Sequence, residues 1–148
     1  MTGFLTNAQQ NAILATYLNT GGSAATLGTA STYMGLSTAS TGMQSAGTVT
    51  GEPTIGTASY ARVTIATNGT TVFGAPSSGS ITNSAGAITF PTAGTGGWSG
   101  TLAYWFLSIS ASTATCIMFG GLSTSVTVAQ GQAPTFATSQ LTLNASGW

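Results

Sequence analysis

The chain has 148 residues, of which Thr (29), Ala (22), Gly (21) and Ser (18) make up 90, and it carries one basic side chain, one acidic side chain and no His. With Glu52 as the only carboxylate, one copy cannot assemble a Ser-His-Asp triad, a His-bearing zinc site or the paired acids of a glycosidase. Arg62 alone cannot neutralise the phosphates that a nucleic-acid site requires. We therefore expect no enzymatic activity, no cofactor or metal site, and no nucleic-acid partner.

The first predicted element is a helix over residues 7–19. Thr6 and Gln9 have the spacing of a capping box, in which each side chain satisfies a free backbone N–H of the other residue. Apolar residues then recur at helical spacing, and Gly21-Gly22 ends the pattern. This predicts a short N-terminal helical arm over residues 1–22.

From residue 30 onward the signals are those of strands, because β-branched and aromatic residues occur in short runs between Gly, Ser, Asn and Pro clusters. No second helix is signalled. Residues 30–148 are predicted to form an antiparallel β-sandwich, with a jelly roll as one possible form, and residues 1–148 to form a single domain. The predicted strands are 32–36, 60–66, 80–83, 87–90, 101–110, 115–119, 125–128, 135–137 and 140–143.

The longest strongly apolar stretch covers residues 102–109. A membrane-spanning helix needs about 20 apolar residues, so this stretch predicts a buried strand and no membrane partner.

The predicted strand at 60–66 alternates in a way that separates two faces. One face, expected to be buried, carries Ala61, Val63 and Ile65. The other face, expected to be partly solvent-exposed, carries Tyr60, Arg62 and Thr64.

Residues 37–58 show no clear element. A stretch of this length is either a functional or partner-held loop, or it hides a strand near residues 48–50.

Glu52 and Arg62 lie on either side of a Gly-containing turn. They form either a buried or interfacial ion pair, or two unrelated surface charges. The two alternatives differ in energy: an exposed pair contributes at most about 1 kcal/mol, whereas removing one member of a buried pair costs about 3–5 kcal/mol.

The composition also favours assembly. A core poor in large side chains gains little from burial, and a net charge near zero leaves nothing to repel one copy from another. We therefore expect a homo-oligomer. The candidate contact residues are the apolar Phe4 and Leu5, Tyr17 on the predicted helix, and Trp98. Trp98 lies in a Gly-rich turn. Its ring either stacks on a sugar or contacts a partner, or it fills the turn as a hydrophobic plug.

Several segments, in order along the chain, resemble a family of small tailed-bacteriophage virion proteins of the tail-fibre-like or capsid-decoration type. The segments are Tyr33-Met34-Gly35-Leu36-Ser37-Thr38-Ala39, Glu52, Ser59-Tyr60-Ala61-Arg62-Val63, Thr82-Asn83, Ile88-Thr89-Phe90-Pro91, Gly97-Trp98, Gly121-Leu122, and Gly131 with Phe136. Family members typically carry more Asp, Lys and Arg, notably where this chain has residues 110–115. Because of this departure, a metal or receptor site of the family cannot be assigned to this chain.

The resemblance implies a non-enzymatic virion structural protein, oligomeric and trimeric, on the head or the tail. The first hypothesis is a cement or decoration protein on the outer capsid surface, which binds and stabilises the shell of the major capsid protein. The alternative is a tail fibre or receptor-binding component, for which a carbohydrate receptor would be a partner.

Overall fold

The computed structural model describes residues 31–67 and 70–144. The predicted helix at 7–19 and the contact candidates Phe4, Leu5 and Tyr17 lie outside these residues. The described chain is mainly β, as predicted, and β1 with β6, β6 with β7, β2 with β3 and β4 with β9 pair antiparallel. No helix among the described residues is long and apolar enough to cross a membrane.

The chain divides into two compact units. The large-sheet unit contains Thr32–Thr64 and Thr89–Thr135, and the ribbon unit contains Ile65–Ile88 together with residues 136–144. The two-layer sandwich and the single domain stay predictions.

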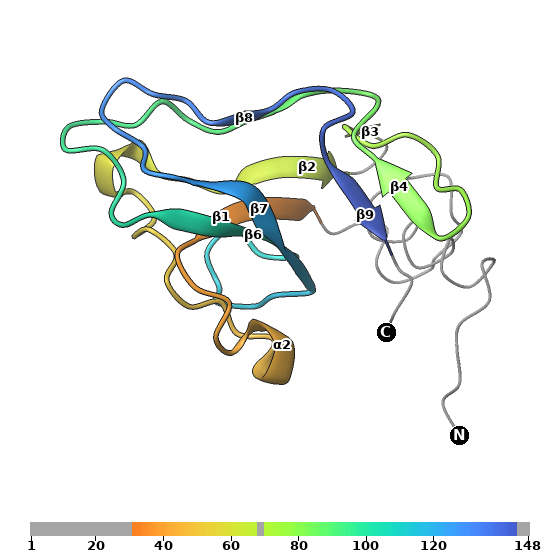
Figure 1. Ribbon diagram of the computed structural model, residues 1–148, viewed down its shortest axis with the longest axis horizontal. Coiled ribbons are helices and arrows are strands. Elements are labelled where there is room, and N and C mark those ends of the chain that lie inside the picture. The colour runs from red at the N-terminus through yellow and green to blue at the C-terminus, as the bar shows by residue number, and fades with distance from the viewer. Residues whose placement is uncertain (1–30, 68–69, 145–148) are drawn as a thin grey trace. The chain divides into compact units, whose positions relative to one another are not determined.

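The large-sheet unit is built on the antiparallel strands β1 (Thr32–Ser37), β6 (Leu102–Ser108) and β7 (Met118–Val126), which Figure 1 shows side by side. The strand order is β2-β1-β6-β7, where β2 is Val63–Thr67. In the register, Gly35 faces Phe106 and Trp105 faces Gly120. A Cβ atom on Gly35 would collide with the Phe106 ring, so the glycine is required for the ring to lie flat on β1.

Loops cover one face of this sheet. Phe106 is fully buried there with Met43, which begins the single-turn helix α2 (Met43–Ala46), and with Val49. Cys116 and Phe119 complete the cluster. A short 3₁₀ turn, Thr57–Ser59, follows along the chain.

Two predictions for this unit are wrong. Residues 115–119 and 125–128 are not two strands, because β7 runs through Gly120, over which the indole of Trp105 lies. Tyr60 and Arg62 do not lie on a wet face: β2 begins only at Val63, and the preceding residues turn inward, so that both side chains are buried. After β1 ends at Ser37, the stretch up to residue 58 contains no further strand, although Thr48 forms an isolated bridge with Thr115.

The ribbon unit contains the antiparallel pair β4 (Ser80–Thr82) and β9 (Thr142–Asn144). Ile81 and Leu143 face each other in the interior, while the hydroxyls of Thr82 and Thr142 lie 2.9 Å apart on the exposed side. In the same unit, the last two residues of β2, Ala66 and Thr67, pair with the short strand β3 (Thr70–Thr71). The short strands β5 (Ile88–Thr89) and β8 (Thr135–Phe136) pair with each other and have residues in both units.

Asn83 holds the ribbon unit together from its interior, where it is 0 % exposed. Its side-chain amide donates to the carbonyls of Gly86 (3.1 Å) and Ala137 (2.9 Å), and its Oδ1 accepts from the N–H of Leu141 (2.8 Å). One side chain thus satisfies three backbone groups from different parts of the unit.

Replacing Asn83 by alanine is expected to lower the free energy of unfolding by about 2–3 kcal/mol, because it leaves three backbone groups without partners. Urea denaturation of the full chain measures this loss. Ser84→Ala, at the exposed neighbouring position, is the control and is expected to change stability by less than about 0.5 kcal/mol. Equal effects of the two substitutions would contradict the role assigned to Asn83.

Candidate functional site

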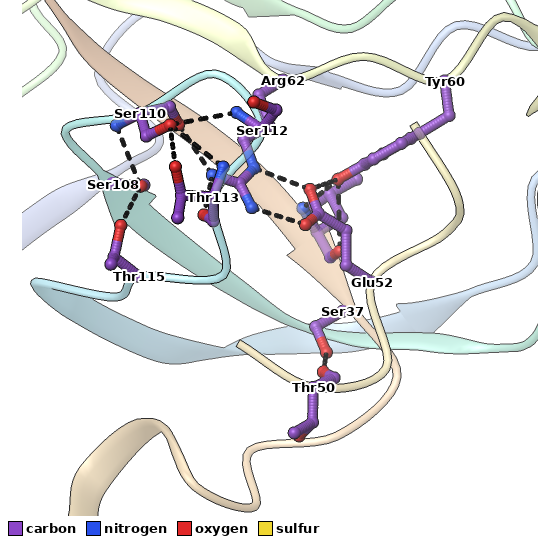
Figure 2. Close-up of polar contacts among 11 residues, drawn as sticks. Ser37, Thr50, Glu52, Tyr60, Arg62, Ser108, Ser110, Ser112, Thr113 and Thr115 are labelled. Atoms are coloured by element: carbon purple, nitrogen blue, oxygen red, sulfur yellow. Dashed lines mark hydrogen bonds and ion pairs between the residues drawn. The ribbon is translucent and has the colours of Figure 1, made fainter. Parts of the chain in front are cut away.

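The only two charged side chains of the sequence meet inside the large-sheet unit (Figure 2). The Arg62 guanidinium donates from Nε to Glu52 Oε1 (2.8 Å) and from Nη2 to Oε2 (2.7 Å). This is a bidentate pair, the strongest geometry for these groups. The Arg62 side chain is 1 % exposed and that of Glu52 13 %, so the contact is a buried ion pair, not two surface charges.

Arg62 also holds the loop that connects β6 to β7. Its Nη1 donates to the carbonyls of Ser110 (2.7 Å) and Thr113 (2.9 Å). On its flat side, the guanidinium carbon lies 4.9 Å from the centre of the Phe106 ring, at cation–π distance. The guanidinium therefore ties the loop to the sheet beneath it.

Tyr60 extends the network to β1. Its hydroxyl donates to Glu52 Oε1 at 2.9 Å and accepts from the backbone N–H of Leu36 at 3.0 Å. The Leu36 carbonyl is farther away, at 3.3 Å, so the charged carboxylate is the better acceptor for the single phenolic proton. Burial, and next the Glu52 charge, raise the pKa of Tyr60 far above its usual value.

The backbone before Tyr60 is shaped to direct this side chain inward. Ala58 and Ser59 adopt positive φ angles of 47° and 62°, which are unusual for residues other than glycine. The resulting turn places the Ala58 carbonyl where it accepts from the N–H of Gly94 (2.8 Å) and from Nε1 of Trp98 (3.1 Å). Local strain is therefore balanced by contacts with a distant segment.

The β6–β7 loop is ordered by its own side chains as well. The backbone N–H groups of Ser112 and Thr113 donate to Ser110 Oγ at 3.3 and 3.0 Å. The loop also joins the 37–58 loop, because the N–H of Val49 donates to the Ala114 carbonyl (3.0 Å). Figure 2 shows the hydroxyl contacts within the 108–115 segment next to the ion pair.

Trp98 lies in the interior of the large-sheet unit, 4 % exposed. Its ring makes edge contacts with Tyr60 (centroids 5.0 Å apart) and Phe90 (6.1 Å). Burial of the ring favours the hydrophobic plug, one of the alternatives predicted for Trp98, and a role in contacts between copies stays a prediction.

The chemical consequence of the network is cross-linking. The Glu52 carboxylate accepts three hydrogen bonds, and the Arg62 guanidinium binds the carboxylate and two carbonyls. The pair therefore connects the 37–58 loop with the β6–β7 loop, and Tyr60 adds β1. Sequence reasoning did not find Tyr60 as the third member, although its position two residues before Arg62 was a signal. The two carbonyl acceptors have no sequence signal.

The raised pKa of Tyr60 predicts loss of stability at alkaline pH. The unfolded chain releases its phenolic proton near pH 10, while the folded chain keeps it, so the free energy of unfolding is constant with respect to this group below about pH 10 and falls above it. The slope from one group is about 1.4 kcal/mol per pH unit.

Tyr60→Phe is expected to remove this slope while costing about 1–3 kcal/mol at neutral pH, because Leu36 loses its acceptor. Burial also raises the pKa of the Cys116 thiol, so both forms are compared by urea denaturation in a Cys116→Ala background. An unchanged alkaline slope in the Tyr60 variant would exclude this phenol as its source.

No curated protein matches the chain. Residues 5–144 match the family model described as podophage GP4 fiber I protein gp80, which agrees with the resemblance derived from the sequence. The match covers nearly the whole chain, and the chain therefore belongs to this family of tailed-phage virion proteins of the tail-fibre type.

Proposed function

We propose that the protein is a non-catalytic structural subunit of a virion fibre, which acts as a homo-oligomer. The observation that carries this proposal is the buried ion pair: the two charged side chains of the sequence bind each other in the interior. The outer contacts of the chain are then left to neutral hydroxyl, amide and apolar groups. Such groups suit a protein that works by packing.

The network also supports the absence of catalysis. A general acid or base must reach a substrate and exchange its proton near neutral pH. Glu52 is already held by Arg62 and Tyr60, and Tyr60 has a pKa raised far from neutrality. Neither group is in a position to carry out such a step.

Membership in a fiber family favours a place on the tail. The second candidate function is that of a capsid decoration protein, which binds the major capsid protein. The neutral, hydroxyl-rich composition favours this function because such a surface suits many weak contacts with a shell. A trimer, implied by the resemblance, is the expected order of the oligomer. Trp98 gives no support for a carbohydrate receptor, since its ring is buried.

The test is immunogold labelling of purified virions, combined with the copy number of this chain relative to the major capsid protein. A fibre predicts label on the tail and few copies per particle. Label spread over the head, with a copy number comparable to that of the major capsid protein, would establish the decoration role instead. Absence from the particle would refute both.

Assembly is expected to be insensitive to salt and to pH between about 5 and 9. Added salt shortens the Debye length from about 10 Å at 0.1 M to about 3 Å at 1 M, but this weakens only contacts between exposed charges. Sedimentation velocity of the full chain across this salt range is expected to give an unchanged oligomer mass. Dissociation at high salt would show that charge holds the copies together.

A further inference from the structure

The basic side chains of the chain decide where proteases of trypsin specificity can cut it. Such a protease cuts after Lys or Arg, because the side chain before the cut bond enters a deep pocket whose carboxylate binds a positive charge. The sequence has no Lys and one Arg, so the bond between Arg62 and Val63 is the only bond of the chain that fits this specificity. Resistance of the folded chain therefore depends on the accessibility of one side chain.

The Arg62 side chain is closed to such a pocket. It is 1 % exposed, and Glu52 binds its guanidinium through hydrogen bonds of 2.8 and 2.7 Å. Nη1 donates to the carbonyls of Ser110 and Thr113, and the Phe106 ring lies against the guanidinium. All three guanidinium nitrogens thus have partners within the protein. Arg62 must give up these contacts before a protease can bind it.

The backbone on both sides of the bond is held as well. On the N-terminal side, Tyr60 is buried, and its hydroxyl contacts Glu52 and the backbone N–H of Leu36 in β1. On the C-terminal side, Val63 begins β2, which lies next to β1 in the sheet. Proteases prefer accessible backbone such as exposed loop tips. The bond can therefore be cut only after this part of the chain has opened.

Glu52 is the residue that holds both the side chain and the backbone before the bond. Its carboxylate lies between Arg62 and Tyr60 and binds both (Figure 2). The β6–β7 loop, which also binds Arg62, is exposed at residues 111–113. Segments with few buried apolar contacts open at a lower free-energy cost than a whole domain. Loss of the Glu52 contacts is thus expected to open the way to the bond.

We propose that the folded protein resists proteases of trypsin specificity, and that the Glu52–Arg62–Tyr60 network is the gate, so that the bond after Arg62 is cut only when this network opens. The cut is a hydrolysis: water adds across the peptide bond and leaves a carboxylate on Arg62 and an amine on Val63. Resistance of this kind protects a subunit on the outside of a particle against secreted proteases. The inference goes beyond the proposed function and does not depend on it.

Trypsin itself is the probe. The full chain is incubated with trypsin in native buffer, and mass spectrometry follows the intact mass. The wild type is expected to stay intact and to give fragments 1–62 and 63–148 once urea unfolds it. Thr95→Arg, at an exposed turn in the same unit, is the control and is expected to be cut after residue 95 at least about 100-fold faster than the wild type is cut after Arg62. Equal rates at the two positions would overturn the protection assigned to burial of Arg62.

Glu52→Gln tests the gate. Loss of the counter-charge is expected to raise the rate of cutting after Arg62 by about 100-fold or more, because the rate follows the open fraction when reclosing is fast. Asn83→Ala is the matched control, since it weakens the ribbon unit and leaves the network in place. It is expected to raise this rate by less than about 10-fold. Equal acceleration by the two variants would show that the bond is exposed only when the whole chain unfolds, which would refute the gate.

Tyr60→Phe provides a second, milder opening of the network, because it removes one contact of Glu52 and keeps the ion pair. It is expected to raise the rate of cutting after Arg62 by a smaller factor than Glu52→Gln, and it replaces that variant if circular dichroism shows that Glu52→Gln does not fold. A rate unchanged from that of the wild type would exclude the network as the gate. Absence of the protein from virions would overturn the proposed function and leave these rates as they are.

Discussion

Replacing Arg62 by methionine is expected to lower the free energy of unfolding by about 3–5 kcal/mol, the cost of removing one member of a buried ion pair. Methionine keeps an unbranched apolar chain over the Phe106 ring but removes the guanidinium. Glu52 then keeps its charge in a nearly buried position with only the Tyr60 hydroxyl as donor, and the carbonyls of Ser110 and Thr113 lose theirs. Urea denaturation of the full chain measures the loss.

The control for this prediction is the double variant Glu52→Gln/Arg62→Met. It removes the stranded carboxylate together with its partner, so a large part of the lost stability is expected to return. The single variant Glu52→Gln is expected to destabilise as well, since it leaves the guanidinium, which is 1 % exposed, without a counter-charge. If the double variant were as unstable as Arg62→Met, the cost would arise from packing and loop contacts, not from the buried charge.

Gly97→Ala is expected to lower the free energy of unfolding by about 3 kcal/mol, for two independent reasons. The φ angle of Gly97 is +69°, in the left-handed region that costs other residues about 1–2 kcal/mol. In addition, an added Cβ would collide with the carbonyl oxygen of Val128 and lie 3.1 Å from the Cα of Ala129. Both are backbone atoms, and the Val128 carbonyl also accepts from the Trp98 N–H at 2.9 Å, so they cannot move without breaking the turn.

Gly96→Ala separates the two causes. Gly96 has a φ angle of +86°, but nothing lies within 4 Å of the position of its Cβ. This substitution is expected to cost only the backbone term of about 1–2 kcal/mol. Thermal or urea denaturation of the pair therefore measures the collision directly, and equal losses would show that the approach to Val128 is not tight.

The sequence predicted the strands wherever β-branched and aromatic residues stand together, and it failed at the Gly120-Gly121 pair. β1 and β6 lie close to their predicted ranges. The sequence predicted two separate strands, at 115–119 and 125–128, on either side of Gly120-Gly121. Instead, β7 passes through this pair, because Gly120 makes room for the indole of Trp105 on the neighbouring strand. The hydrophobic period and the composition of one segment do not show that an aromatic ring from another strand packs on it.

The candidate site shows the same limit. Glu52 and Arg62 were candidates only because they are the two charged side chains of the sequence, and the sequence left open whether they form a pair. The inward turn at Ala58 and Ser59, which buries Tyr60 and Arg62, depends on the N–H groups of Gly94 and Trp98, which donate to the carbonyl of Ala58. The alternation of residues 60–66 pointed to the opposite burial, since it assumed a strand that begins three residues too early.

By itself, the sequence determined that this is a nearly uncharged, β-rich chain and that it carries the ordered segments of a tailed-phage virion family, because these properties follow from composition and local pattern. Only the tertiary structure showed that the two charged side chains form an ion pair next to the β6–β7 loop. Only the tertiary structure showed that β7 is an exposed, uncharged edge strand. The reason is physical: burial and strand register arise from contacts between segments far apart in the chain, and no local pattern specifies which segments these are.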